Sequence, residues 1–408
     1  MNIWIVHNYA MPPFISGVTK HFMLAKELQK KGHSPVIIAA NLNHKNKTTP
    51  MPQGQTHIHT SYEDIPFLWL KTLSTSEGYI KRVANMFVFF WRLMMKTGFD
   101  KLQKPDVIMG CSPEPFAALA ALLIAKRYKI PYVLHMGDLW PLSLIDIGNI
   151  SKYHPFILLV GWVEKYLYKH ANCIATPLPT IKNHVARKGG NPDNVVWLPN
   201  GVDTEKLPEY KSPETSETFK IYYAGAHGPA NSLDAVLDAA KITQAVNSNI
   251  EFYFIGDGPG KVDLQKRAAQ EGISNITFFT PLPKDQIYAE LQKADAFIIN
   301  FRDLSVLREG GVSPNKIYDY MGIGRPTIVG CSAPTNPAKL ANAGITVAAN
   351  DAQALSKAAQ VLQQMPPNEC QQLGKNGYNA VLENNTYTQI GRTLENILQD
   401  VIKNISPT

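Results

Sequence analysis

The residues with the clearest chemistry lie between Gly310 and Gly330, where two glycines precede a short helical pattern and an apolar strand. Glycines before a helix leave backbone N–H groups free to converge on an anion. Lys316, in the first turn, adds a point charge that suits a phosphate. Asp319, one turn later, is placed to accept hydrogen bonds from a ribose diol. The pattern indicates a nucleotide diphosphate site, with an ordinary loop before a core helix as the alternative.

The same stretch resembles the donor-binding segment of the family 4 glycosyltransferases, which have the GT-B fold. The run DYMGIGRP, which begins at Asp319, matches the second half of the family's donor helix, with Asp in place of Glu. The family's first acid should fall at Gly311, and the nearest carboxylate is Glu309. The resemblance implies that either Glu309 or the amides of 311–313 contact the donor sugar. It also implies donor contacts from five residues of this stretch: Gly311, Ser313, Asn315, Lys316 and Asp319.

Two further motifs carry the resemblance. The segment HMGDLWP, from His135 to Pro141, is similar to a signature of the branch that acts in bacterial surface-polysaccharide assembly. The segment PNGVD at 199–203 is among the family's most specific marks. His135 and Asp138 follow a predicted strand at its carboxyl end, where ligands of such sheets bind. We take both as catalytic candidates together with Glu309, and a core histidine is the alternative for His135.

Glycines in three strand–helix loops complete the expected donor set: Gly17, Gly228 and Gly256. In much of the family, an Arg and, five residues later, a Lys hold the diphosphate in the loop that contains Gly228. This chain has Ala226 and Asn231 at those positions. Lys316, the backbone amide at Gly228 and, as a further candidate, Arg308 would then neutralise the phosphates.

The elements that must position these residues follow the rhythm of a doubly wound α/β chain. Residues 2–40 read as strand, loop, helix and strand, and the rhythm restarts after a polar, Pro-containing segment at 204–218. We therefore expect the GT-B fold, with two Rossmann-like doubly wound parallel-sheet domains facing across a cleft. The expected parts are an acceptor-binding domain at 1–203, a nucleotide-sugar donor domain at 204–387, and a C-terminal helix at 388–408 that crosses back to the first domain.

Composition narrows the class of protein. An apolar fraction of 45% is sufficient for two cores. Four scattered cysteines form no Cys-x-x-Cys, which favours a reducing compartment and argues against a zinc site. The N-terminus has no secretory pattern, and no apolar run approaches the roughly 20 residues of a spanning helix. We expect a cytoplasmic protein with no cofactor, no metal and no nucleic-acid partner.

Charge is unevenly divided along the chain. Residues 1–200 are near +11 and the remainder near −4. A helix pattern at 79–96 joins Phe, Trp and Met to a basic rim, which suits a helix at a membrane interface, while its apolar character on nearly all sides favours burial. The apolar helix pattern at 155–168 reads as plain core. We expect peripheral attachment to the anionic inner face of the cytoplasmic membrane, with a role in solubility alone as the alternative.

The resemblance implies a retaining, metal-independent hexosyl- or N-acetylhexosaminyltransferase. It would move sugar from a nucleotide diphosphate sugar to a lipid-linked glycan acceptor in surface polysaccharide or lipopolysaccharide synthesis. The missing Arg, Lys and first acid leave open a non-catalytic subunit that binds nucleotide or acts as a scaffold. A nucleotide-sugar 2-epimerase, which shares the fold, is the remaining alternative.

Overall fold

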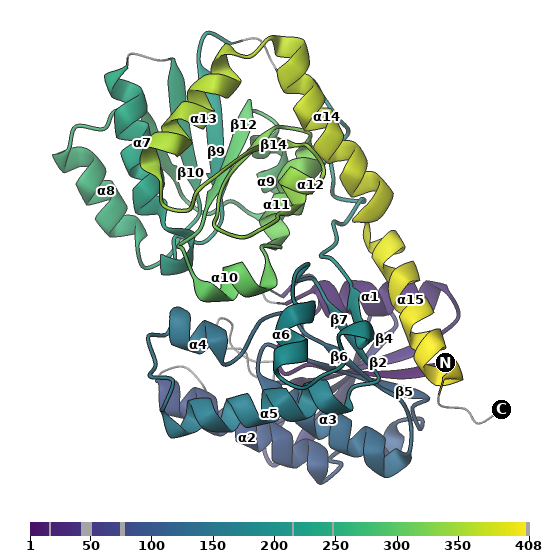
Figure 1. Cartoon of the computed structure of the whole chain (residues 1–408). Coiled ribbons are helices and arrows are strands. Elements are labelled where there is room, and N and C mark those ends of the chain that lie inside the picture. The colour runs from purple at the N-terminus through teal and green to yellow at the C-terminus, as the bar shows by residue number, and fades with distance from the viewer. Residues whose placement is uncertain (16–17, 42–50, 74–77, 214–215, 247–248, 405–408) are drawn as a thin grey trace. The chain divides into compact units, whose positions relative to one another are not determined.

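A computed structural model describes the chain except residues 16–17, 42–50, 74–77, 214–215, 247–248 and 405–408 (Figure 1). The chain divides into two compact units, the first formed by Met1–Pro199 with Tyr387–Thr408 and the second by Asn200–Thr386. Each unit is a parallel sheet with helices packed against it. The expected α/β class with two Rossmann-like parallel-sheet domains is therefore confirmed.

The first unit contains a sheet of eight strands in the order β3-β4-β2-β1-β5-β6-β7-β8. All neighbours are parallel except β3 and β4, which form an antiparallel hairpin at the edge. The strands are β1 (Asn2–Val6), β2 (Ser34–Ala40), β3 (His57–Tyr62), β4 (Ile65–Leu70), β5 (Val107–Cys111), β6 (Tyr132–His135), β7 (Cys173–Thr176) and β8 (Val195–Trp197). The helices are α1 (Lys20–Lys30), α2 (Tyr79–Met94), α3 (Pro115–Tyr128), α4 (Leu142–Asp146), α5 (Pro155–His170), α6 (Lys182–Arg187) and α15 (Tyr387–Lys403), with short 3-10 turns at Phe99–Lys101 and Pro192–Asn194.

The second unit contains a six-stranded parallel sheet in the order β11-β10-β9-β12-β13-β14. Its strands are β9 (Phe219–Ala224), β10 (Ile250–Ile255), β11 (Ile276–Phe279), β12 (Ala296–Asn300), β13 (Thr327–Gly330) and β14 (Gly344–Val347). Its helices are α7 (Leu233–Ala245), α8 (Lys261–Gln270), α9 (Lys284–Leu291), α10 (Ser305–Gly310), α11 (Asn315–Ile323), α12 (Pro337–Leu340), α13 (Ala352–Gln364) and α14 (Pro367–Asn384), with a 3-10 turn at Pro229–Asn231. In each sheet the strand order reverses beside the first strand, and ligands of doubly wound sheets bind at such a point.

Two outer helices of the first unit cover a buried one. Helix α3 is apolar on nearly every side, and its buried residues run from Pro115 to Ala125 because β5 lies on one face and α2 and α5 on the other. Its Phe116 ring lies 4.6 Å from the ring of Phe87 on α2 and 6.2 Å from that of Phe156 on α5. Both outer helices are thus anchored on α3 by one side only.

The opposite sides of α2 and α5 are exposed. On α2 the exposed large side chains include Trp91, at 60% exposure, and Ile80, while Phe89 and Leu93 face inward. On α5 the exposed large side chains are Leu158, Leu159 and Trp162. The prediction that 155–168 is plain core is therefore wrong for half of the helix. A uniformly apolar helix pattern does not reveal which side the fold leaves uncovered.

The last helix completes the core of the first unit rather than that of the second. Helix α15 packs against α1, and its residues Ile390, Leu394 and Leu398 are buried in the core of the first unit. Gly391 lies so close to Glu27 of α1 that a Cβ there would approach the Glu27 Cβ to 2.5 Å. The two helices therefore meet through a small residue.

A buried guanidinium fixes the junction between α11 and β13. Arg325 is 1% exposed and donates hydrogen bonds to the carbonyls of Ala294, Lys211 and Gln292, at 2.7, 2.7 and 3.0 Å. These acceptors belong to the loop before β12 and to the segment that enters the second unit. Arg325 thus ties two distant segments to the end of α11.

Replacing Arg325 with Met should destabilise the second unit by at least about 3 kcal/mol, because three carbonyls, that of buried Ala294 among them, lose their charged donor. Hydrogen exchange monitored by mass spectrometry, with peptides assigned to residues 200–386, measures the change. The matched control is Arg302→Met, since Arg302 is exposed in the same unit. Equal protection in the two variants would contradict the structural role of Arg325.

Candidate functional site

The first candidate site lies at the carboxyl end of β9, beside the point where strand order reverses in the second sheet. Three glycines bring two loops into backbone contact there. A Cβ on Gly256 would lie 2.0 Å from the Gly225 carbonyl oxygen, and one on Gly258 would lie 2.7 Å from the carbonyl oxygen of His227. All three glycines have positive φ. Gly256, predicted as a donor contact, therefore has a packing function that accounts for its missing side chain.

Lys316 reaches this loop from the first turn of α11. Its Nζ donates to the Tyr223 hydroxyl at 2.8 Å and to Asn231 Oδ1 at 3.1 Å, and it lies 4.4 Å from the centre of the Tyr223 ring. A Cβ on Gly225 would come within 2.7 Å of this Nζ. Burial lowers the pKa of Lys316 to about 8, so the amine stays mainly protonated at pH 7. A desolvated ammonium thus lies beside the glycine loop.

Asp319 lies one turn after Lys316 on the same helix. Its Oδ1 accepts a hydrogen bond of 2.9 Å from the Tyr288 hydroxyl on α9. Burial raises the pKa of Asp319 to about 6, and the Tyr288 hydrogen bond acts in the opposite direction. The carboxylate is therefore ionised at neutral pH and already accepts one hydrogen bond.

The other predicted donor residues of the second unit differ in their exposure and in whether their polar groups already form hydrogen bonds. Gly228 has open space where a Cβ would stand, and Asn315 is exposed at the start of α11. The Gly311 amide already donates to the Leu307 carbonyl at 2.9 Å, so it is engaged within α10. The Ser313 hydroxyl forms a hydrogen bond of 2.9 Å with the Tyr318 hydroxyl, and the Ser313 carbonyl accepts one of 2.7 Å from the Asn200 side-chain amide.

The two remaining candidates of this stretch lie on α10, and Gly17 cannot be placed. Glu309 is partly buried, whereas Arg308 forms an ion pair with Asp303, both side chains being about half exposed. Arg308 is therefore paired with a carboxylate. Gly17 lies outside the described residues.

The second candidate site lies at the carboxyl ends of β1, β5 and β6 in the first unit. The imidazoles of His7, His21 and His135 gather there, each 2% exposed. His21 Nε2 and His135 Nδ1 are 3.1 Å apart, and the rings of His7 and His21 lie 4.3 Å from each other. Burial lowers the pKa of all three, to about 4 for His7, and the nearby Lys20 lowers it further for the other two. The three rings are therefore neutral at pH 7.

Cys111 completes a group that has the donor atoms of a metal site. One ligand atom each of His21, Cys111 and His135 lie within 4.8 Å of one another. The Lys20 amine, whose pKa burial lowers to about 7, lies near the Cys111 thiol and opposes a cation there. Two buried ring nitrogens, His21 Nδ1 and His135 Nε2, have no hydrogen-bond partner among the described residues.

Asp138, predicted alongside His135, is engaged in local structure. Its Oδ1 accepts hydrogen bonds from the Leu139 amide at 2.7 Å and from the Ser143 hydroxyl at 2.5 Å. Burial raises the pKa of Asp138, and these hydrogen bonds lower it. The carboxylate therefore stabilises the turn into α4.

Several residues that the sequence did not single out belong to these sites. Tyr223 and Tyr288 hold Lys316 and Asp319, and His227 lies buried in the glycine loop with both ring nitrogens unpaired within the part of the chain that the structure covers. Burial lowers the pKa of His227 to about 4. The periodic pattern marks these residues as core aromatics, because their polar atoms become visible only when strands and helices are packed.

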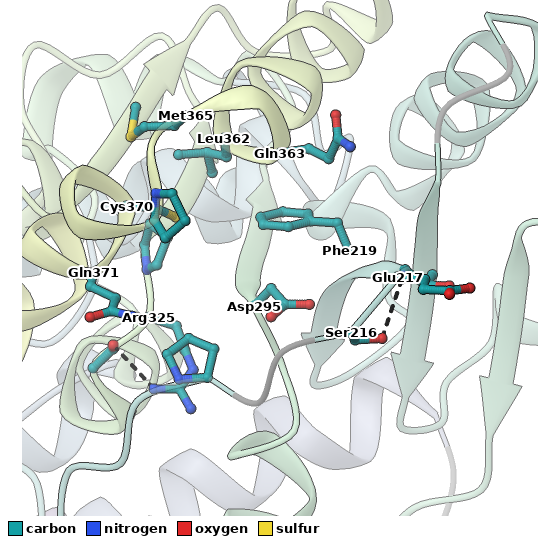
Figure 2. Close-up of a pocket in the computed structure, with 15 residues that line it drawn as sticks. Ser216, Glu217, Phe219, Asp295, Arg325, Leu362, Gln363, Met365, Cys370 and Gln371 are labelled. Carbon is teal, nitrogen blue, oxygen red and sulfur yellow. Dashed lines mark hydrogen bonds between the residues drawn. The ribbon is translucent and has the colours of Figure 1, made fainter.

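A separate cavity lies at the amino ends of the strands of the second sheet, opposite the end that carries the glycine loop. Figure 2 shows Phe219, Asp295 and Arg325 around it, together with Cys370 and Met365. Its volume is about 250 Å³, and it borders the amino ends of β9, β12 and β13. None of the predicted site residues lines it.

Comparison with known proteins places both units among glycosyltransferases. The family described as "Glycosyl transferase 4-like domain" matches residues 16–201, and "Glycosyl transferases group 1" matches residues 204–380. The chain is 24% identical over 276 residues to the putative colanic acid biosynthesis glycosyl transferase WcaI of Escherichia coli K12, covering 64% of this chain and 66% of that protein. It is 27% identical over 211 residues to the sulfoquinovosyl transferase SQD2 of Arabidopsis thaliana, covering 48% and 38%. The chain thus spans less than two thirds of these relatives.

Solved structures agree in fold over the whole chain. The sucrose-phosphate synthase of Thermosynechococcus elongatus superposes with a TM-score of 0.76 at 13% identity, covering 99% of both chains. HepE of Anabaena, solved in complex with UDP and glucose, superposes with a TM-score of 0.67 at 12% identity, covering 98% of this chain and all of HepE. At these identities the likeness shows the fold alone.

Replacing His21 with Gln should make the stability of the first unit less sensitive to acid. A histidine whose folded pKa is depressed contributes stability that is complete above pH 6.5 and declines as the pH falls toward its folded value. Removing this group should reduce the slope of unfolding free energy against pH by up to about 1.4 kcal/mol per pH unit between pH 6.5 and 4.5. Burial raises the pKa of Glu114 to about 8, so this carboxyl group lowers the stability of the first unit as the pH rises. It does so equally in wild type and in His21→Gln.

The measurement is the thermal unfolding of wild type and His21→Gln between pH 6.5 and 4.5. Hydrogen exchange in peptides of the first unit is used to detect the unfolding. His154→Asn, a change at an exposed histidine that keeps a side-chain acceptor at the start of α5, is the control. Parallel pH profiles for the wild type and His21→Gln would show that the buried imidazole titrates normally.

Proposed function

We propose, because this chain belongs to the family 4 glycosyltransferases, that it transfers a sugar from a nucleotide diphosphate sugar to a glycan acceptor. The second unit holds the donor and the first unit binds the acceptor. The observation that carries the proposal is the Lys316 ammonium beside the glycine loop of β9. It supplies, from α11, the positive charge that the loop positions Ala226 and Asn231 do not.

The reaction we propose retains the anomeric configuration and uses no metal. The bond from the sugar C1 to the β-phosphate oxygen breaks, and a bond from the acceptor oxygen to C1 forms on the same face. The acceptor proton passes to the departing phosphate, so no separate protein base is needed. Lys316 stabilises the negative charge that develops on the leaving diphosphate. A bound diphosphate also favours the ammonium form of this amine, whose pKa burial lowers to about 8.

The acceptor we propose is a lipid-linked glycan of surface polysaccharide synthesis, handled at the cytoplasmic side of the membrane. The name of the WcaI relative, which refers to colanic acid biosynthesis, supports this pathway class. The transferred group is a hexosyl or N-acetylhexosaminyl unit. Over the residues that the structure covers, no helix has the length and apolar character to cross a bilayer. The attachment that we propose is peripheral.

The outer sides of α2 and α5 supply a surface for such attachment. Ile80 and Trp91 of α2 lie at helical spacing with Met95, which follows the helix, along its exposed side, and Leu158 and Trp162 have helical spacing on α5. Exposed basic residues flank both stripes: Lys81 and Arg82 on α2, and Lys165 and Lys169 on α5. Apolar stripes with basic borders suit the headgroup region of an anionic leaflet.

Purified wild-type protein should cleave one member of a panel of UDP- and GDP-linked hexoses and N-acetylhexosamines slowly to the free nucleoside diphosphate. Lys316→Ala should weaken binding of that donor by roughly 1–3 kcal/mol, the range for a charged hydrogen bond. Calorimetry gives the affinity and chromatography gives the released nucleotide. Lys293→Ala, which removes an exposed lysine just after α9, is the matched control.

The outcomes separate the alternatives. Donor binding without any cleavage or transfer, even with lipid-linked acceptors present, would identify a non-catalytic subunit. Release of a 2-epimerised sugar would identify an epimerase. Unchanged donor affinity in Lys316→Ala would remove Lys316 from the phosphate site.

Co-sedimentation with vesicles tests the membrane surface. Binding to phosphatidylglycerol vesicles should exceed binding to phosphatidylcholine vesicles and fall at high salt. The double change Lys81→Gln with Arg82→Gln should lower partitioning by about 30-fold, because each basic residue near the leaflet contributes about 1 kcal/mol. The double change Trp91→Ser with Trp162→Ser should lower it on both lipids.

The control is Trp197→Ser, since Trp197 is 45% exposed in the first unit but stands outside both helices. Equal binding of wild type to neutral and anionic vesicles, or no loss in the α2 variants, would refute this surface.

A further inference from the structure

The contact between Tyr288 and Asp319 joins two helices of the second unit. Tyr288 lies in the last turn of α9, which follows β11, and Asp319 lies in the middle of α11. The phenol oxygen and Asp319 Oδ1 are 2.9 Å apart, both residues are partly buried, and α9 packs against α11. The phenol is the donor in this pair, because its ordinary pKa is about 10 while that of the carboxyl group is about 6 here.

The Tyr288 hydroxyl therefore holds one oxygen of the Asp319 carboxylate in place. Because the carboxylate is rigid and planar, this bond also restricts the orientation of the second oxygen. A carboxylate offers about four acceptor positions, and a phenol fills one of them. Two neighbouring hydroxyls of a ribose could donate to the positions that remain. The carboxylate must be ionised for this, since a protonated carboxyl group exchanges an acceptor position for a donor.

We propose that Tyr288 is the positioning residue for Asp319, and that the pair makes the site selective for ribonucleotide over 2′-deoxyribonucleotide donors. The proposal rests on the proposed function of the second unit. A site built to pair with a hydroxyl rejects an analogue that lacks it, because its buried polar group then loses a partner. Tyr288 acts through Asp319 and needs no contact with the donor.

The same contact governs the pH range in which the site works. Burial raises the pKa of Asp319 toward neutrality, and the Tyr288 hydrogen bond lowers it. The Tyr320 phenol, on α11 itself, also lies near this carboxyl group. The remaining helices in contact with α11 are α12 and α14, whose Lys339 and Lys375 are exposed. Without the Tyr288 hydroxyl the pKa should rise further, so that the carboxyl group protonates at a higher pH.

The experiment compares wild type, Tyr288→Phe and Tyr222→Phe. Tyr222→Phe is the matched control, because its hydroxyl donates to Glu290 of the same helix α9 at 3.2 Å, whereas the hydroxyl that donates to Asp319 is that of Tyr288. Calorimetry measures binding of UDP, GDP, ADP and CDP and of their 2′-deoxy counterparts from pH 5 to 8. Wild type should bind its preferred ribonucleotide at least about tenfold more tightly than the deoxy form, and affinity should fall below about pH 6.

Tyr288→Phe should lose about tenfold in affinity for the ribonucleotide, bring the ribo-to-deoxy ratio close to one, and shift the acid loss of affinity to higher pH. Tyr222→Phe should match wild type in all three. An unchanged ratio and pH midpoint in Tyr288→Phe would overturn the proposal, as would an equal loss for both sugars without a pH shift, which marks a packing defect only.

A second measurement separates this proposal from the proposed function. Carboxyl-¹³C-aspartate NMR titration of the free protein, with Asp319→Asn to assign the signal, gives the pKa of Asp319 with and without the Tyr288 hydroxyl. If wild type binds none of the nucleotides, the donor function fails. An Asp319 pKa that does not rise in Tyr288→Phe overturns the positioning role whether or not nucleotide binds.

Discussion

The arrangement of the second unit depends on one buried cation. Arg325 lies at the end of α11 and donates to three carbonyl groups from two separate segments. A buried guanidinium is stable only when its donors are matched, so the segments it joins have little freedom to move independently. Because α11 ends against this residue, the positions of Lys316 and Asp319 along that helix are fixed by a contact on the side away from the proposed nucleotide site. Arg325 belongs to the motif that marks the family, yet its contacts are structural.

In the proposed donor site, the positive charge comes from helix α11 and not from the loop after β9. The loop after β9 carries Asn231 where related chains carry a lysine, and Asn231 instead accepts a hydrogen bond from Lys316. Tyr223 supports the same amine with its hydroxyl and its ring. The glycine loop stays close to this group because its backbone has no side chains to hold it away. The cationic character of the site is thus provided by α11 and oriented by β9.

The sequence predicts the repeating framework well and the side-chain partners poorly. Buried parallel strands such as β1 and β9 appear as short apolar runs, and the motif order identified the fold. The hairpin of β3 and β4 was overlooked, because β3 carries polar residues at a sheet edge and resembles a loop. The exposed side of α5 was missed since an apolar helix pattern has no direction. Tyr223 and Tyr288 were missed for a related reason: a tyrosine in a periodic pattern looks like core until the packing shows where its hydroxyl points.

The position of α15 affects how this protein can be made. The first unit is discontinuous in sequence, and its core takes in Ile390, Leu394 and Leu398 from a helix that a ribosome synthesises after residues 200–386. Residues 200–386 form a compact unit of their own, so they can fold while α15 is still emerging. Until then, the face of α1 that α15 covers stays open to water. The first unit consequently completes its core only after all of the second unit has been synthesised.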